Sequence, residues 1–368
     1  MKLIKALALF TVITASAQDN YNLLVGTYTN ACQSKGIYVY DFNVNTLEAK
    51  LKSSTDAVIN PSYLTVTKDK KYLYSVNEDG AKSTVSSFKY NAATGKIDFI
   101  NKKDSGGADP CYIINDDKNV IVANYTGGTI SVFERKPDGS LSDAVQVVKH
   151  SGNGPDKSRQ EAPHLHMVYF SPDKKYVFAN DLGTDKIYMY SYNADGKAKT
   201  LTLKQSFSVK AGSGPRHLVF NPNGTFVHLL QELDGTLTTL DYTNDKLTTV
   251  QEINVNPNLL GGKHGAADIH FSNDGKFLYT TNRGDANTVS VFRVHANGML
   301  SMVQQISTQG SGPRNFIVGP NDGFVLIANQ NTNNIAIFKR DKSTGFLSYT
   351  GKKIELCSPV CLVFTANK

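Results

Sequence analysis

The chain has 368 residues, of which 40% are hydrophobic and 19% charged, and its aromatic residues are 18 Tyr and 18 Phe with no Trp. This composition excludes a disordered or collagen-like chain. Lys and Arg number 39 against 32 Asp and Glu, and the net charge of +7 permits an anionic partner without locating the charge. Length alone suggests two or three domains, although closed all-β architectures often exceed the usual domain size.

Residues 1–17 have the pattern of a secretory signal peptide. Lys2 and Lys5 precede an apolar run over residues 6–13, and the small residues Ala15-Ser-Ala form a cleavage site. The run is too short to span a bilayer, and no later stretch reaches about twenty apolar residues. We therefore expect an exported protein, periplasmic or secreted, without a membrane span. A buried N-terminal strand is the alternative.

After the leader, one unit recurs along the chain. Short runs of Val, Ile, Tyr, Phe and Thr alternate with Gly, Asn and Asp turns, and strong helix patterns are absent. Each unit has a strand, a tight turn, a second strand and a more variable hairpin. The unit starts lie about fifty residues apart, at Pro61, Pro110, Leu165, Pro215, Ala266, Pro313 and Pro359. Seven such units predict an all-β fold, a seven-bladed β-propeller with four antiparallel strands per blade.

The two ends of the chain are predicted to complete one blade together. The last unit holds a single strand, residues 360–364, whereas residues 23–28, 36–42 and 48–53 fit the second, third and fourth strands of a blade. Joining them removes an open sheet edge. Residues 18–368 are therefore expected to form one seven-bladed domain, and the lack of Trp argues against a WD40 propeller.

The four cysteines do not make a disulfide scaffold in a chain of this length. Cys357 and Cys361 are expected on one strand, where their spacing is too long for a bridge between them. Cys32 would meet one of these two if the chain ends come together, and either pairing is possible. No Cys-x-x-Cys motif occurs, so metal binding by cysteine is not expected.

Propeller geometry is expected to bring residues from all seven units to one channel mouth. The first strand of a blade lines the channel, and the second strand runs antiparallel to it. The start of the first strand and the end of the second strand therefore lie at the same mouth of the channel. The residues after the unit starts are Ser62, Cys111, His166, Arg216, Ala267, Arg314 and Val360. The second strands end at Tyr28-Thr29, Asn77-Glu78, Asn124-Tyr125, Asn180-Asp181, Gln231-Glu232, Asn282-Arg283 and Asn329-Gln330. Among the residues that converge there are His166, Glu232 and three arginines.

This set of residues suits a small molecule that carries an anion. Arginine offers a fixed fork of donors for carboxylate or phosphate. Glutamate or histidine can serve as a general base, and a cationic donor can hold a developing oxyanion. Each also has a structural interpretation. Asn77, Asn124 and Asn329 at strand ends could be only turn chemistry. Glu232 and Arg283 could form an ion pair between blades, and Arg216 and Arg314, which follow Gly-Pro, could brace loops.

Other chemistries have less support. His164 and His166 share a strand face, a spacing that metal sites use, but no third ligand is evident and no metal is expected. His217 and His270 suit core positions as well as ligands. Neither a Gly-x-Ser-x-Gly elbow nor a Walker loop occurs, and no concentrated run of Lys and Arg indicates nucleic-acid binding.

Four segments carry a resemblance to a known family. They are Pro163-His-Leu-His with Ser171-Pro-Asp-Lys, Gly212-Ser-Gly-Pro-Arg-His-Leu-Val-Phe with Gln231-Glu-Leu, Ala266-Ala-Asp-Ile-His with Thr281-Asn-Arg, and Gln309-Gly-Ser-Gly-Pro-Arg-Asn-Phe with Asn329-Gln. As a set they resemble the bacterial propeller family of 6-phosphogluconolactonases, whose relatives include the fungal carboxy-muconate cyclase. The resemblance covers essentially the whole chain after the leader.

The resemblance implies hydrolysis of a sugar δ-lactone to its aldonate without metal or other cofactor. It also implies functional roles for His166, Arg216, Glu232 and Arg283, all of which are already in the two rings. The family's named reaction belongs to cytoplasmic metabolism, whereas this chain begins with a leader. The natural lactone therefore stays open.

We expect a lactonase, a carboxylic ester hydrolase. Arg216 and Arg283 would hold anionic or carbonyl oxygens, and Glu232 or His166 would activate water while the other assists proton transfer to the ring oxygen. Further substrate contacts are expected from Arg314, Gln330, His164, His217 and Asn282. The partner would be a small anionic or lactone substrate, and the chain a monomer or dimer. The alternatives are a non-catalytic exported propeller that binds a glycan or protein, and a muconate-type cyclase acting on an unsaturated dicarboxylate.

Overall fold

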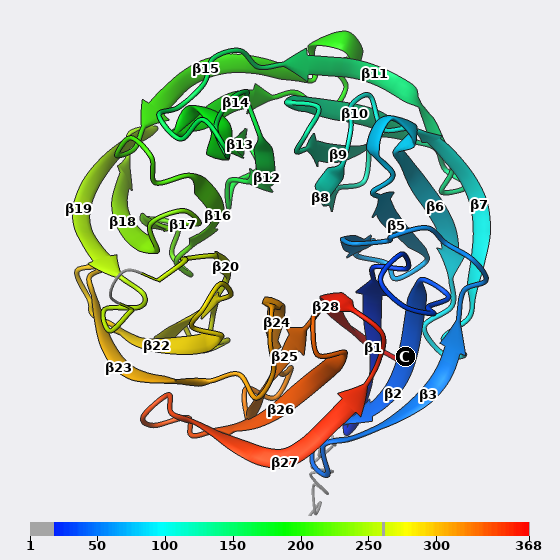
Figure 1. Ribbon diagram of the computed structural model, residues 1–368. Helices are drawn as coiled ribbons and strands as arrows, with labels where there is room; N and C mark the ends of the chain where they lie inside the picture. Colours follow the sequence, from blue (N-terminus) through cyan, green and yellow to red (C-terminus); the bar gives the residue numbers. More distant parts are fainter. Residues whose placement is uncertain (1–17, 260–261, 368) are drawn as a thin grey trace, which may run out of the picture.

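The computed structural model describes residues 18–259 and 262–367, and the predicted signal peptide at residues 1–17 lies outside them. Seven four-stranded antiparallel sheets stand around a central channel, as Figure 1 shows, which confirms the predicted seven-bladed propeller. In this described part of the chain the helical pieces are three short 3₁₀ turns, η1 (Gly80–Lys82), η2 (Leu182–Thr184) and η3 (Lys197–Lys199). No helix there is long and apolar enough to cross a membrane.

Strands occur in four concentric positions, from the channel to the rim. The innermost strands are β4 (Leu64–Val66), β8 (Pro110–Asn115), β12 (Leu165–Phe170), β16 (Pro215–Phe220), β20 (Ala266–Phe271), β24 (Pro313–Val318) and β28 (Pro359–Ala366). The second strands are β1 (Asn20–Thr27), β5 (Tyr72–Asn77), β9 (Asn119–Asn124), β13 (Tyr176–Asp181), β17 (Phe226–Gln231), β21 (Phe277–Asn282) and β25 (Phe324–Asn329).

The two outer positions complete each blade. The third strands are β2 (Ile37–Asn43), β6 (Thr84–Tyr90), β10 (Thr129–Arg135), β14 (Lys186–Tyr192), β18 (Thr236–Thr243), β22 (Thr288–Val294) and β26 (Asn334–Arg340). The outermost are β3 (Glu48–Ser54), β7 (Ile97–Asp104), β11 (Leu141–Lys149), β15 (Leu201–Ser208), β19 (Lys246–Asn254), β23 (Leu300–Ser307) and β27 (Leu347–Glu355).

The hydrophobic core lies between the blades. Every residue of β9 and of β25 is buried, because a neighbouring blade covers each face of these strands. One apolar cluster joins Tyr74 of β5 to Val122 of β9 and Phe133 of β10. The outer strand β19, by contrast, has only exposed and half-buried residues. Burial therefore decreases toward the rim, and the channel-facing strands are held rigidly.

Six of the seven predicted unit starts coincide with the first residue of an inner strand. The exception is the unit expected from Pro61, because β4 begins only at Leu64. Asn60 has a positive φ of 37°, and its side chain accepts from the Thr29 N–H and donates to the Glu78 carbonyl, both at 2.7 Å. Backbone pairing with β5 and the residue after it continues ahead of β4, since the Glu78 N–H donates to the Asn60 carbonyl at 3.2 Å and the Val76 N–H to the Tyr63 carbonyl at 3.1 Å.

The chain ends share one blade, as predicted. Its strands follow the order β28-β1-β2-β3, with Val25 of β1 opposite Leu362 of β28. The side chains of Gln18 and Asn367 lie within hydrogen-bond distance, with Nε2 and Oδ1 separated by 2.9 Å. The N-terminal and C-terminal strands therefore close the ring.

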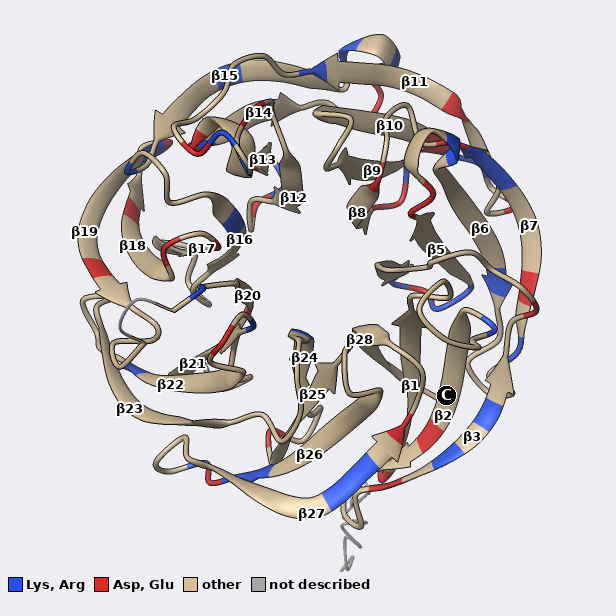
Figure 2. Cartoon of the chain, viewed as in Figure 1, with Lys and Arg blue, Asp and Glu red and all other residues tan. Residues whose placement is uncertain are grey.

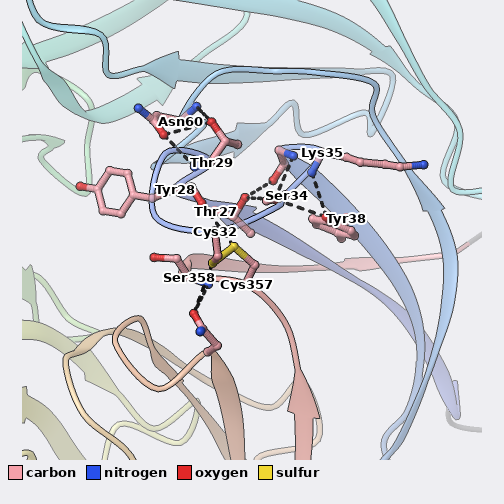
Figure 3. The surroundings of a disulfide bond; sticks show 12 residues. Thr27, Tyr28, Thr29, Cys32, Ser34, Lys35, Tyr38, Asn60, Cys357 and Ser358 are labelled. Atoms are coloured by element: carbon pink, nitrogen blue, oxygen red, sulfur yellow. Dashed lines mark hydrogen bonds between the residues drawn. A yellow bond between two sulfur atoms is a disulfide. The ribbon is translucent and has the colours of Figure 1, made fainter.

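A disulfide fixes the same blade at the channel mouth (Figure 3). Cys32, in the loop after β1, is bonded to Cys357, and their Cα atoms lie 6.0 Å apart. Cys361 is instead a buried free thiol within β28. The expectation that Cys357 and Cys361 share a strand was wrong, because Ser358 adopts a positive φ of 38° and its N–H donates to Asn333 Oδ1 at 2.9 Å.

We predict that replacing both Cys32 and Cys357 with Ser lowers the free energy of unfolding by about 2–5 kcal/mol, since the bridge closes a loop of nearly the whole chain. Thermal unfolding with and without reductant measures this. The double variant should be insensitive to reductant, whereas the wild type should lose stability in it. Equal unfolding temperatures for the oxidised wild type and the variant would contradict the prediction.

Candidate active site

Glu232 lies at the centre of a group of arginines at the channel mouth. It follows β17 directly, and its side chain is 7% exposed. Glu232 Oε2 lies 2.9 Å from Arg216 Nε and 2.9 Å from Arg283 Nη2, and Oε1 lies 2.7 Å from Arg159 Nη2. Arg216 is in the same blade and Arg283 in the next, so the ion pair between blades considered from the sequence is present.

The arginines keep Glu232 ionised. Burial alone would raise the pKa of Glu232, but the charges of Arg283, Arg216 and Arg159 outweigh it and hold this pKa well below its ordinary value. Burial and Arg283 lower the pKa of Arg216 to about 10, so its guanidinium also stays charged at neutral pH. A carboxylate held in this way anchors cations and is a weak proton acceptor.

Arg216 is held from its other side by His217. Arg216 Nη1 lies 3.3 Å from His217 Nε2 and also donates to the Ala267 carbonyl. His217 Nδ1 lies 2.8 Å from Asp268 Oδ1. Burial and the charge of Arg216 lower the pKa of His217 to about 4, so the ring is neutral at neutral pH. Asp268 therefore orients His217, and His217 in turn supports the guanidinium.

His166 faces the same carboxylate from β12. Its Nε2 lies 3.9 Å from Glu232 Oε2, and its Nδ1 lies 3.8 Å from Cys111 Sγ. Burial and then the charge of Arg216 hold the pKa of His166 well below its ordinary value. The ring is consequently neutral at neutral pH and able to accept a proton.

The sequence analysis missed Arg159. It lies in residues 150–164, the longest connection between blades, and its Nη2 is also 3.2 Å from the Tyr125 hydroxyl. The two rings contained only residues at strand starts and ends, whereas Arg159 reaches the mouth from a loop. The unusual length of this connection was the available signal.

Arg314 and Gln330 extend the polar mouth. Arg314 Nη2 lies 3.9 Å from Glu78 Oε1, and the guanidinium lies over the Tyr28 ring at 5.4 Å. Gln330, with Glu232, lines a cavity of about 430 Å³. Figure 2 shows basic residues at the inner ends of β16 and β24, the strands that carry Arg216 and Arg314. The arrangement favours an anionic ligand.

Two other predicted contact residues have their polar atoms engaged elsewhere. His164 stacks on Tyr125 at 4.5 Å, and its Nε2 lies 3.1 Å from Glu161. Asn282 accepts from the Gly265 N–H and donates to the Arg283 carbonyl, each at 3.2 Å. The amide of Asn282 thus bonds to backbone groups beside the mouth. The roles of all the predicted site residues stay predictions.

No group of three His, Cys, Asp or Glu side chains suited to a metal occurs within residues 18–259 and 262–367. The pair singled out by its spacing, His164 and His166, contacts the same Tyr125 ring, which His164 stacks on and His166 meets edge-on, and His166 also lies beside Glu232. Metal independence is left as a prediction from the resemblance.

Comparisons with known proteins agree with this architecture. A family model described as a seven-bladed β-propeller lactonase matches residues 22–364. A 6-phosphogluconolactonase from Bacillus subtilis is 34% identical over 92% of this chain and 97% of its own length. The structure of a 6-phosphogluconolactonase candidate from Bacteroides fragilis has a TM-score of 0.91 at 42% identity, covering 96% of this chain and 99% of that one. The periplasmic gluconolactonase of Pseudomonas aeruginosa has a TM-score of 0.89 at 35% identity, with 95% and 100% covered.

We predict that Glu232→Gln lowers the free energy of unfolding by about 3–5 kcal/mol, because it leaves three clustered guanidinium groups without their carboxylate. Urea unfolding measures the loss, and added phosphate should restore part of it to this variant by binding the arginines. Glu252→Gln, an exposed substitution on β19 of the same blade, is the matched control.

The pH dependence gives a second check of the same ion cluster. The pKa of Glu232 is lower in the folded protein than the ordinary 4.5 that it has in the unfolded chain. The ionised carboxylate therefore stabilises the fold fully above pH 4.5. This stabilisation is lost as the pH falls through the pKa of the folded protein. The stability difference between wild type and Glu232→Gln should therefore shrink in acid. A difference that grows in acid would count against this account of Glu232.

Proposed function

The chain belongs to the family of seven-bladed β-propeller lactonases, and on that premise we propose that it hydrolyses the ester bond of a sugar δ-lactone and releases the aldonate. The observation that carries the proposal is the mouth cluster, in which neutral His166 lies beside a carboxylate that gathers three arginines. Such a site combines a proton acceptor with donors for a developing oxyanion.

The proposed reaction is addition of water followed by loss of the ring oxygen. The water oxygen forms a bond to the lactone carbonyl carbon, and its proton passes to His166 Nε2. Arg216 and Arg283 stabilise the oxyanion. The bond from the carbonyl carbon to the ring oxygen then breaks, and the ring oxygen takes up a proton. His166 suits the role of base better than Glu232, because three guanidinium groups stabilise Glu232 as a carboxylate.

The substrate class follows from the charge of the site and from the named relatives. In the described residues, the ion pairs of Arg159, Arg216, Arg283 and Arg314 are made with two carboxylates, Glu232 and Glu78. The excess of guanidinium groups over carboxylates in these pairs favours a substrate or product that is itself anionic. The Bacillus subtilis relative is named a 6-phosphogluconolactonase and the Pseudomonas aeruginosa protein a gluconolactonase, so lactones with and without a phosphate are both candidates.

Export is part of the proposal. The leader pattern at residues 1–17 and the disulfide between Cys32 and Cys357 both favour an oxidising compartment. The Pseudomonas aeruginosa protein is described as periplasmic. An unphosphorylated aldonolactone outside the cytoplasm is the substrate that fits this location best.

The activity is tested by following acid release from glucono-δ-lactone and from its 6-phosphate above the spontaneous rate. We predict that Arg283→Ala lowers kcat/KM by about 100- to 1,000-fold, the usual effect of removing an oxyanion donor. Arg293→Ala, which removes an exposed arginine of β22, should leave kcat/KM unchanged. Binding of either lactone without turnover would instead favour a non-catalytic propeller.

We also predict the position of the acid limb of the pH profile. A general base must be unprotonated, so activity falls as the pH drops through its pKa. Because the pKa of His166 lies well below 6.5, kcat/KM should hold its value well into mildly acidic solution. His166→Gln should lower kcat by about 100- to 10,000-fold. An acid limb at or above pH 6.5 in the wild type would argue against His166 as the base.

A further inference from the structure

A second carboxyl group, the half-buried Glu78, lies at the same mouth. It follows β5 directly, the position that Glu232 has after β17. The Tyr28 hydroxyl lies 3.1 Å from both Glu78 oxygens, and the Ser62 hydroxyl donates to Oε1. Ser62 follows Pro61 just as Arg216 follows Pro215 in the later blade. At this equivalent position, a hydroxyl group therefore lies beside Glu78 and a guanidinium lies beside Glu232.

The partners of Glu78 differ in kind from those of Glu232. A guanidinium can only donate hydrogen bonds and carries a positive charge, so it favours the ionised carboxylate over the neutral acid. Hydroxyl groups both donate and accept, and they can therefore bind a carboxyl group in either protonation state. Within residues 18–259 and 262–367, the ion pair of Glu78 is with Arg314 at 3.9 Å, whereas the three arginines on Glu232 lie 2.7–2.9 Å from it.

The charges that face Glu78 support this contrast. Burial raises the pKa of Glu78 and the carboxylate of Asp109 adds to that effect, while Arg314, Ser62 and Tyr28 oppose it only in part. Cys111 is the other titratable group nearby, and burial raises the pKa of its thiol, so it adds no charge at neutral pH. Glu78 thus exchanges a proton more readily than Glu232.

Glu78 is linked to the arginine cluster through Arg314. Arg314 Nη2 lies 3.9 Å from Glu78 Oε1, and the charge of Arg314 also acts on His166, Arg216 and Arg283. The backbone of Glu78 is fixed separately, since its N–H donates to the Asn60 carbonyl at 3.2 Å and its carbonyl accepts from Asn60 Nδ2 at 2.7 Å. The carboxyl group is therefore not needed to hold the chain in place.

We propose that Glu78 is a catalytic residue, the acid that donates a proton to the ring oxygen of the lactone as that oxygen leaves. This rests on the proposed function. The proton taken from water resides on His166, the Glu78 proton moves to the ring oxygen, and the bond from the carbonyl carbon to that oxygen breaks. Exchange with solvent then removes the proton from His166 and restores one to Glu78, so that lactone and water give the hydroxy acid. Tyr28 and Ser62 are positioning residues for Glu78.

The test is the pH dependence of kcat on glucono-δ-lactone for wild type, Glu78→Gln, Glu78→Asp and Asp79→Asn, after subtraction of the spontaneous rate. A general acid must be protonated to donate its proton. Wild-type kcat should therefore fall as the pH rises through the pKa of Glu78, which lies above the ordinary 4.5 of a glutamate. Glu78→Gln should lower kcat by about 100-fold or more and abolish this basic limb. Glu78→Asp should retain the limb at a reduced rate. The control Asp79→Asn changes the exposed neighbouring carboxylate and should resemble wild type.

A basic limb that persists in Glu78→Gln, or a rise in KM at unchanged kcat, overturns the role of Glu78 while leaving the lactonase assignment intact. A wild type that hydrolyses neither glucono-δ-lactone nor its 6-phosphate overturns both. The unfolding temperature of Glu78→Gln is measured as well. If it equals that of the wild type, the change in kcat does not come from loss of the fold.

Discussion

Pairing of β28 with β1 is the constraint on which the rest of the molecule depends. It lets every blade pack against two neighbours, so the strands between them are buried on both faces. The mouth depends on it as well. Tyr28 follows β1 in the closing blade, Arg314 comes from the blade before it and Glu78 from the blade after it. Only a closed ring brings these three side chains together.

Charge is balanced differently on the two sides of the mouth. On one side Glu232 offsets the repulsion among three guanidinium groups, and its ionised form is fixed by donors that cannot accept. On the other side Glu78 has hydroxyl partners and one distant arginine. Equivalent positions in two blades therefore hold carboxyl groups whose pKa values are shifted in opposite directions. Active sites often separate the pKa values of two groups in this way when one acts as acid and the other stays ionised.

The fold was predictable because turn residues recur at regular intervals and mark the strand boundaries. Two of the inner strands, for example, begin at Pro110 and Pro215 as predicted. At Pro61 the regular strand begins three residues later than predicted, at Leu64, although the Asn60 and Tyr63 carbonyls still accept from backbone N–H groups of the neighbouring chain segment. Arg159 was not predicted at the mouth, because the order of the strands does not determine the path of a long loop. In the structure this loop brings Arg159 to Glu232. For Asn282 the residue type at a strand end does not show which partners its amide has, and in the fold it accepts from the Gly265 N–H.

The meeting of the chain ends has a topological consequence. Gln18 and Asn367 lie within hydrogen-bond distance, and the Cys32–Cys357 bridge spans 325 positions. The backbone with its bridge is thus nearly a covalent circle. A single protease cut in an outer turn such as the one around η3 would leave one molecule, its fragments joined by the bridge. The ring has no privileged first blade, so a circular permutant that joins residues 18 and 367 and opens in that turn would bring the same side chains to the same mouth.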